Sequence, residues 1–338
     1  MAQINTLSIR QGNRLALSRA LSAVENDQPE SRAILKELFP FTGHAYLIGV
    51  TGATGTGKST LVNQLAKTLR SNIADGEPPK IAIVAVDPSS PFTGGALLGD
   101  RIRMQDLAGD KGIFIRSMAS RGALGGLAHK TAAFTTILDG AGYDIIFIET
   151  VGAGQAEVEI TRLAHTVIVV EAPGLGDGIQ AIKAGILEIA DILVVNKSDR
   201  PEAENTARAL QMMLEITYNS GSMPLAGKHR LQQNTSQTQP TPYRKSAWEP
   251  PVLLTVATEG TGIQNLVTNI QNHKAHLTES GLWHEKEAHR LRQDLQALIR
   301  DTLVSQWQHN LDETKYKQVL GDVLKRELTP QEAVDLLI

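Results

Sequence analysis

The sequence predicts an α/β fold with a doubly wound, mostly parallel β-sheet, helices on both faces of the sheet, and helical extensions at both ends of the chain. Short apolar runs rich in β-branched residues alternate with helical patterns, and strands buried on both faces read as continuous apolar runs of this kind. Glycine or acidic residues end or follow several runs, at the sheet edge where open α/β folds bind ligands. The predicted strands are Tyr46–Thr51, 81–86, 113–118, 143–149, Thr166–Glu171, Ile192–Asn196 and 251–257.

Helical patterns flank the predicted sheet domain on both sides. The predicted organisation is an N-terminal helical extension over 1–43, an α/β sheet domain over 44–275 and a C-terminal helical arm over 276–338. Apolar residues recur at helical spacing in the arm, which predicts helices over 282–308 and 313–327. A last short helix begins with a capping box, because Thr329 is followed three residues later by Glu332, with Pro330 at the first helical position.

One stretch, 219–251, breaks the alternation of strands and helices. It is rich in Ser, Gln, Thr, Pro and Gly and has no hydrophobic period, so we expect a mobile surface insertion. The alternative is a basic partner-binding loop, since four basic residues face a single acid there, Glu249. The four are Lys228, Arg230, Arg244 and Lys245.

Composition excludes several classes of protein. The 338 residues hold 33 Lys and Arg against 36 Asp and Glu, a formal net charge of −3, so no overall basic field could hold nucleic acid or anionic lipid. Only 4% of residues are aromatic, which argues against an RNA-stacking surface. The chain has no cysteine, which excludes disulfides, thiolate metal sites and a cysteine nucleophile.

The sequence also bears on cellular location. No apolar run approaches the roughly 20 residues that a membrane-spanning helix needs. Residues 1–24 contain three arginines and no acid, a bias found in organelle transit peptides, but their apolar residues recur at helical spacing and there is no signal-peptide core. We therefore expect a cytoplasmic protein, with an organellar matrix left open.

The strongest motif is a phosphate-binding loop between a strand and a helix. It matches G-x-x-x-x-G-K-[ST], and its residues are Gly52, Ala53, Thr54, Gly55, Thr56, Gly57, Lys58 and Ser59, followed by Thr60. Glycines let backbone N–H groups wrap a phosphate at the positive end of the following helix. Lys58 would neutralise the β- and γ-phosphates, and the Ser59 hydroxyl would ligate magnesium.

A second motif predicts the base. Asn196-Lys197-Ser198-Asp199 follows the apolar run 192–195, and in an N-K-x-D tetrad the aspartate accepts two hydrogen bonds from guanine that adenine cannot donate. Lys197 can lie along the base, and Asn196 can brace the phosphate loop. The alternative is an ordinary turn after a strand.

A third base-binding segment is expected after the last strand, at Val256-Ala257-Thr258. Many GTPases have a Ser-Ala pair here, whose alanine N–H contacts the guanine oxygen. Val256 replaces the serine, so a hydroxyl contact is lost, whereas the backbone contact can persist.

Acidic residues at strand ends are the candidates for magnesium and water. Asp87 and Glu149 each follow an apolar run, and Glu149-Thr150-Val151-Gly152 resembles a D-x-x-G switch in which the Gly152 N–H senses the γ-phosphate. The alternative for Asp87 is a helix cap or turn acid before a proline. The nine histidines lack ligand spacing and are expected to be solvated or satisfied core residues.

Longer blocks resemble the MeaB/ArgK/MMAA family of SIMIBI-class GTPases. They are D-P-S-S-P-F-T-G-G-A-L-L-G-D-R at 87–101, S-R-G-A-L-G-G-L at 120–127, E-T-V-G-A-G-Q at 149–155 and P-G-L-G-D-G-I-Q-A-I-K-A-G at 173–185. The resemblance extends over nearly the whole chain. Departures are Val256, Thr54 where proline is frequent, and the 219–251 segment.

The resemblance implies a homodimeric, magnesium-dependent GTPase that escorts an adenosylcobalamin-dependent mutase, most often methylmalonyl-CoA mutase, and gates its cofactor loading. It implies a first switch from Asp87 to Asp100, a second from Glu149 to Gln155 and a third over 174–183. Asp100 then joins Ser59, Asp87 and Glu149 as a magnesium ligand. Gln155 joins Lys58, Asp87 and Glu149 as a catalytic residue.

Three alternatives remain open at this point. A phosphotransferase could use the same loop and magnesium to pass the γ-phosphate to a protein or small molecule, although no acceptor-activating base stands out. A metal-delivery GTPase commonly carries Cys- or His-rich tracts, which this chain lacks. A nucleotide-dependent dimer scaffold would need no useful hydrolysis.

Overall fold

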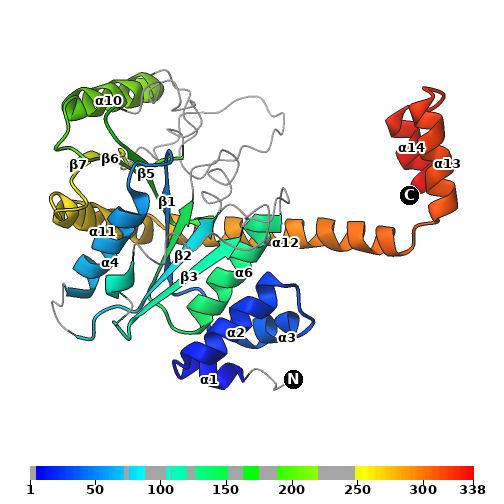
Figure 1. The fold of residues 1–338 in the computed structure, drawn as a ribbon, viewed down its shortest axis with the longest axis horizontal. Helices are drawn as coiled ribbons and strands as arrows, with labels where there is room; N and C mark the ends of the chain where they lie inside the picture. Colours follow the sequence, from blue (N-terminus) through cyan, green and yellow to red (C-terminus); the bar gives the residue numbers. More distant parts are fainter. Residues whose placement is uncertain are drawn as a thin grey trace. The chain divides into compact units, whose positions relative to one another are not determined.

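A computed structural model gives the fold of the chain (Figure 1). The residues it describes are 5–71, 76–87, 104–107, 109–119, 126–150, 163–174, 189–219 and 248–338. They divide between two compact units, Met1–Arg290 and Leu291–Ile338. Among the described residues, no helix has both the length and the apolar character needed to cross a membrane.

The first unit is built on a seven-stranded sheet, whose described strand pairs are all parallel. The strands are β1 (Tyr46–Thr51), β2 (Ile81–Asp87), β3 (Ile113–Ala119), β4 (Ile145–Thr150), β5 (Thr166–Glu171), β6 (Ile192–Asn196) and β7 (Val252–Thr255). Their order is β3-β2-β4-β1-β5-β6-β7, so β1 lies at the point where the winding direction reverses. Open α/β sheets bind ligands outside the carboxyl ends of the strands at such a point. The predicted fold class is confirmed.

Helices cover both faces of this sheet, because its strands are apolar on both sides (Figure 1). One face packs against α4 (Lys58–Ser71) and α11 (Ile263–Glu279). The other face packs against α6 (Gly126–Gly140) and α10 (Ala203–Asn219). Alternate residues of each central strand point to opposite faces, as in β1, where Leu47 joins one core and Ile48 the other.

The N-terminal extension folds as α1 (Thr6–Arg10), α2 (Arg14–Glu25), α3 (Glu30–Leu38) and the 3₁₀ turn η1 (Phe39–Phe41). Leu17, Leu21 and Val24 of α2 are buried in the same core as α6. Arginine side chains link α2 to the outermost strand, β3: Arg14 donates to the Ile113 carbonyl at 2.7 Å. Arg116 of β3 in turn donates to Ser22 and Glu25 of α2.

Helix α12 (Leu282–His309) begins in the first unit and continues into the second, which also holds α13 (Glu313–Leu324) and α14 (Pro330–Leu337). The predicted capping box of α14 is present, with reciprocal bonds between Thr329 and Glu332. Helix α13 ends three residues earlier than the sequence pattern suggests. Arg326 has a φ of 66°, in the left-handed region that stops a helix.

Candidate nucleotide-binding site

The predicted phosphate loop, residues 52–57, connects β1 to α4 at the reversal point of the sheet. Strand β1 lies between β4 and β5, so its carboxyl end opens between two neighbouring parallel strands. Helix α4 begins at Lys58, directly after the loop, so the positive end of the helix lies at the loop that is predicted to bind phosphate.

At two positions of the loop, both the positive φ angle and the close approach of neighbouring atoms require glycine. Gly52 has a φ of 136°, and a Cβ there would lie 2.0 Å from the Val170 carbonyl oxygen of β5. Gly57 has a φ of 94°, and a Cβ there would lie 2.4 Å from Nδ2 of Asn196. The loop is therefore seated directly on β5 at one end and on the N-K-x-D tetrad at the other.

Lys58 is buried and folds back over the loop. Its ammonium donates to the carbonyl oxygens of Gly52, at 2.8 Å, and Ala53, at 2.9 Å. Both acceptors belong to the loop, so the charge lies within the loop that is predicted to bind phosphates. An ammonium on a flexible stem can exchange these carbonyls for phosphate oxygens without backbone rearrangement.

Ser59 and Glu149 meet at the same edge of the sheet. The Ser59 hydroxyl donates to Oε1 of Glu149 at 2.6 Å, and both side chains are buried. Asp87 ends the neighbouring strand β2, whose preceding residue, Val86, is in register with Thr150. The Asp87 side chain itself lies outside the described residues.

A hydroxyl beside a carboxylate is a donor set that suits magnesium, which takes hard oxygen ligands together with substrate phosphates. Ser59 and Glu149 therefore fit the ion that the sequence predicts. Of the other residues predicted at this edge, Asp100, Gly152 and Gln155 lie outside the described residues. So do nearly all residues of the three predicted switches and residues 220–247 of the predicted insertion.

Asn196 joins the tetrad to the phosphate loop and to β7. Its Nδ2 donates to the Thr56 carbonyl at 2.8 Å, and its Oδ1 accepts from the Thr255 hydroxyl and from the Ala257 N–H. These three bonds define the orientation of the buried amide. The bracing of the loop that the sequence predicted for Asn196 is thus present in the geometry.

Lys197 and Asp199 lie on the outer side of this junction. The Lys197 backbone has a φ of 59°, and its ammonium donates to the Gly55 carbonyl at 2.6 Å. Asp199 is exposed, as a carboxylate must be if it is to meet a base that enters from solvent.

The expected base loop forms a tight turn after β7. The Val256 N–H donates to the Thr261 carbonyl, and Val256 and Ala257 are buried while Thr258 is exposed. The Ala257 N–H is used by Asn196 in this geometry. A guanine contact by the same N–H would have to share or displace that bond.

Sequence reasoning missed three threonines of this site. Thr255 fixes Asn196, and the Thr150 hydroxyl donates to the Thr51 hydroxyl at 3.1 Å, linking the ends of β4 and β1. All three side chains are fully buried. Their only signal in the sequence is a hydroxyl at the end of an apolar run, where a buried polar side chain needs a partner.

A second polar cluster lies at the opposite, amino ends of β1, β5 and β6, where α12 begins. We call it the arm-root cluster; its members are Tyr46, His165, Thr166, Asp191, His273, Trp283, Lys286, Glu287 and Arg290. The Leu47 N–H donates to Nδ1 of His165, whose Nε2 lies 2.7 Å from Oε1 of Glu287. Trp283 stacks on the His165 ring with centroids 4.0 Å apart.

Burial dominates the titration of the cluster's histidines. It lowers the pKa of His165, against the opposing effect of Glu287, and lowers the pKa of His273 to about 4, against the attraction of Asp191. Burial raises the pKa of Glu287, but hydrogen bonds from His165 and Arg290 outweigh it and bring that pKa to about 2. Both rings are therefore neutral at pH 7, as expected of satisfied core histidines.

The reversal-point loop, its lysine and the N-K-x-D tetrad together define a P-loop protein of the GTP-binding class. A family model described as methylmalonyl-CoA mutase-associated GTPase MeaB matches residues 17–312. The chain belongs to this family, and it is a GTPase. The resemblance drawn from the sequence motifs is confirmed.

Individual relatives agree with this assignment. A putative GTPase of Pyrococcus horikoshii is 41% identical over 330 residues, which cover 98% of this chain and 95% of the relative. The GTPase ArgK of Escherichia coli is 34% identical over 96% of this chain and 91% of its own length. A crystal structure described as an LAO/AO transport system kinase matches with a TM-score of 0.66 and 27% identity, over 98% of this chain and 94% of that one.

Proposed function

We propose that the chain is a GTP-dependent chaperone of an adenosylcobalamin-dependent acyl-CoA mutase, with methylmalonyl-CoA mutase as the expected partner. GTP hydrolysis would gate cofactor loading and protect or reactivate the mutase. The observation that carries the proposal is the match over residues 17–312 to a family described as mutase-associated GTPases. In such proteins the output is a conformational state that a partner reads.

The geometry supports a division of roles around GTP. Lys58 would leave the Gly52 and Ala53 carbonyls for the β- and γ-phosphates, and backbone N–H groups of 52–60 would surround them. Asp199 would select guanine, with Lys197 along the base and Asn196 holding the loop beneath it. Gly152 and Gln155 keep the switch and catalytic roles that the family resemblance implies.

Magnesium would be held by Ser59, Glu149 and Asp87 at the ends of α4, β4 and β2, with Asp100 as the further ligand implied by the resemblance. The ion would neutralise charge that develops on the phosphates during transfer to water. The Ser59–Glu149 hydrogen bond supports this assignment because it places two hard oxygen donors 2.6 Å apart at the correct edge of the sheet.

We also propose that the chain forms a homodimer through its C-terminal arm. In the second unit, α12 carries three leucines at helical spacing that are 40–58% exposed, which is unusual for a chain that stays monomeric. They are Leu291, Leu295 and Leu298. Light scattering should give a dimer mass for the wild type and a monomer mass for the Leu295→Ser/Leu298→Ser variant, whereas Gln296→Ser should stay dimeric. A monomeric wild type would refute the dimer.

The chaperone proposal is tested by capture and by kinetics. The tagged chain, purified from its own cells with a GTP analogue, should bring down a cobalamin-dependent mutase. Purified methylmalonyl-CoA mutase should then accelerate GTP hydrolysis by the wild type. A chain that captures no cobalamin enzyme, and whose hydrolysis no acyl-CoA mutase changes, is not such a chaperone.

A phosphotransferase remains the second candidate. It is favoured by one observation, the likeness at a TM-score of 0.66 to a protein described as a transport system kinase. Incubation with γ-labelled GTP distinguishes the two functions. A GTPase releases all label as inorganic phosphate, whereas a kinase leaves label on a protein or small-molecule acceptor.

A further inference from the structure

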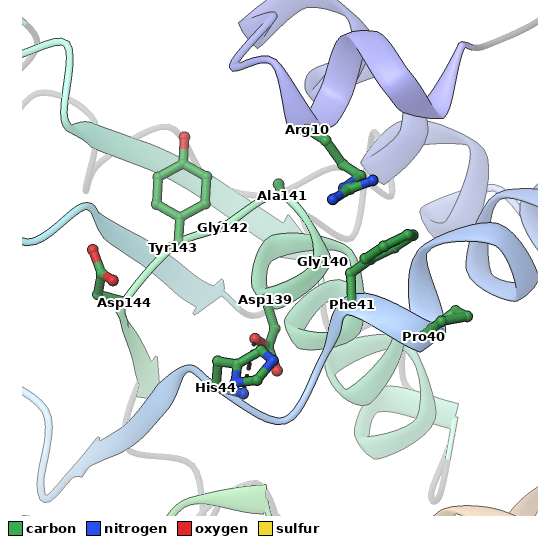
Figure 2. Close-up of a pocket in the computed structure, with 10 residues that line it drawn as sticks. All are labelled: Arg10, Pro40, Phe41, His44, Asp139, Gly140, Ala141, Gly142, Tyr143 and Asp144. Atoms are coloured by element: carbon green, nitrogen blue, oxygen red, sulfur yellow. Dashed lines mark hydrogen bonds between the residues drawn. The ribbon is translucent and has the colours of Figure 1, made fainter.

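A surface recess of about 370 Å³ lies between the N-terminal extension and the turn from α6 to β4. Its residues precede β1 and β4 in the chain, whereas the nucleotide loop follows the end of β1. Its lining includes Arg10 of α1, Phe41 and His44 of the segment before β1, and Tyr143 of the turn before β4 (Figure 2). Its volume lies within the range of roughly 300–1,000 Å³ that is typical of ligand sites. None of its residues takes part in the proposed GTP chemistry.

Arg10 is the feature of the recess that points to a ligand. Its guanidinium carbon lies 3.5 Å from the centroid of the Phe41 ring, so the group is held over the aromatic face. Within the described ranges it donates no hydrogen bond and forms no ion pair, although Asp139 and Asp144 also line the recess. Arg10 is exposed, whereas four other arginines of this unit are bonded to carbonyls or carboxylates: Arg14, Arg70, Arg116 and Arg290.

The two acids of the recess are turned toward backbone donors. Asp139 accepts from the N–H groups of Gly43, His44 and Ala45, at 2.6 to 3.3 Å. Asp144 accepts from the Lys80 N–H at 2.7 Å, and Figure 2 shows its carboxylate at the far end of the recess from Arg10. Arg10 thus offers an unused bidentate edge, the geometry that binds a carboxylate.

The rest of the recess decides which anion fits. α6 ends at Gly140 in its floor, and the partial negative charge of a helix C-terminus, together with Asp144, disfavours a doubly charged phosphate. The rings of Phe41 and Tyr143, with Pro40, provide apolar walls. We propose that this recess, centred on Arg10, binds a small organic acid: a single carboxylate carried on an apolar or aromatic body.

Phenylacetate is a suitable probe, with phenylacetamide as its uncharged match, titrated against the full-length chain by saturation-transfer NMR. Phenylacetate should bind with a dissociation constant on the order of 5 mM, as expected for a fragment of this size. Phenylacetamide should bind about tenfold more weakly or worse, because it cannot pair with the guanidinium. Equal binding of the two probes, or no binding of phenylacetate, overturns the proposal.

Variants place the binding at Arg10. Arg10→Gln should weaken phenylacetate binding about tenfold, whereas Arg32→Gln, an exposed arginine of α3, should leave it unchanged. Phe41→Leu, which removes the ring that holds the guanidinium, should weaken it about threefold and gives a second readout. Inorganic phosphate should not compete at equal concentration; if it does, or if Arg10→Gln binds like Arg32→Gln, the proposed site is wrong. GTP hydrolysis stays at the wild-type rate in all three variants, so this test is independent of the proposed function.

Discussion

The two ends of strands β1, β5 and β6 differ in how their polar groups are used. At the carboxyl ends, Lys58 and Lys197 rest on carbonyls of a glycine-rich loop. At the amino ends, the arm-root cluster pairs buried side chains with one another, as His165 does with Glu287. The lysines at the carboxyl ends can exchange their carbonyl partners for groups of a ligand. The side chains of the arm-root cluster are bonded to one another, which fixes the geometry of the cluster.

This contrast teaches that one sheet can be adaptable at one edge and rigid at the other. Substitutions at the carboxyl edge should change GTP binding and turnover with little effect on stability. Substitutions in the arm-root cluster should change stability and its pH dependence with little effect on turnover. Four predictions test the contrast.

The largest expected effect is on turnover. Lys58→Ala should lower the rate of GTP hydrolysis about 10³-fold, because no other loop side chain supplies a positive charge to the phosphates. Its thermal unfolding should stay close to that of the wild type. Lys67→Ala, farther along α4, is the matched control. Ordinary turnover in Lys58→Ala would refute the phosphate-loop assignment.

The second-largest expected effect is on the affinity for the guanine base. Asp199→Ala should weaken GTP binding about 100-fold, since two hydrogen bonds to a carboxylate are lost, and should leave stability unchanged. Calorimetric titration with GTP and competition with ATP measure it, with Glu204→Ala on α10 as control. If the wild type bound ATP as well as GTP, Asp199 would not be the specificity residue.

At the amino edge the readout is acid stability. The folded pKa of His273, about 4, is below that of an unfolded histidine, so the unfolded chain binds the proton more readily and stability falls as pH drops from about 6.5 to about 4. This group should account for on the order of 2–3 kcal/mol of that loss. His273→Gln should therefore lose less stability across this window, by urea unfolding.

Its control is Gln271→Ala, at an exposed and uncharged residue of α11, where the pH slope should match that of the wild type. GTP hydrolysis at pH 7 should be similar in both variants. If His273→Gln and the wild type lose stability in parallel, the neutral buried ring is not what makes this edge acid-sensitive.

The smallest expected effect tests whether Thr255 acts on GTP binding only through Asn196. Thr255→Val removes the hydroxyl that orients Asn196 but keeps the shape of the side chain, so GTP affinity should fall about fivefold. Thr255→Ser should restore it. A fall as large as that of Asp199→Ala would mean that Thr255 acts on the nucleotide directly.

Much of the fold could be predicted because the strands are buried on both faces. The predicted bounds of β1, β5 and β6 match the structure, since an apolar run between polar residues has no other stable placement. The predicted fourth strand began two residues too early, because Gly142 has a φ of 83° and belongs to the turn after α6. The predicted last strand was too long at its end, because Val256 turns back to pair with Thr261.

The candidate site also has a part that the sequence predicts and a part that only the fold reveals. The phosphate loop and the tetrad are local patterns and could be predicted, whereas the Asn196–Thr56 bond joins residues that only the sheet order brings together. The arm-root cluster could not be predicted at all. Tyr46, His165, Asp191 and Glu287 are far apart in sequence and have no common spacing, so only tertiary packing reveals their relation.

The contact between α2 and β3 has a consequence for biosynthesis. β3 is an outer strand of the sheet, and an open strand edge is a template for unwanted pairing with other chains. Arg14 occupies the outward carbonyl of Ile113, and α2 precedes β3 in the chain. The ribosome therefore synthesises α2 before β3, so the helix whose arginine contacts the open edge is already present when β3 emerges.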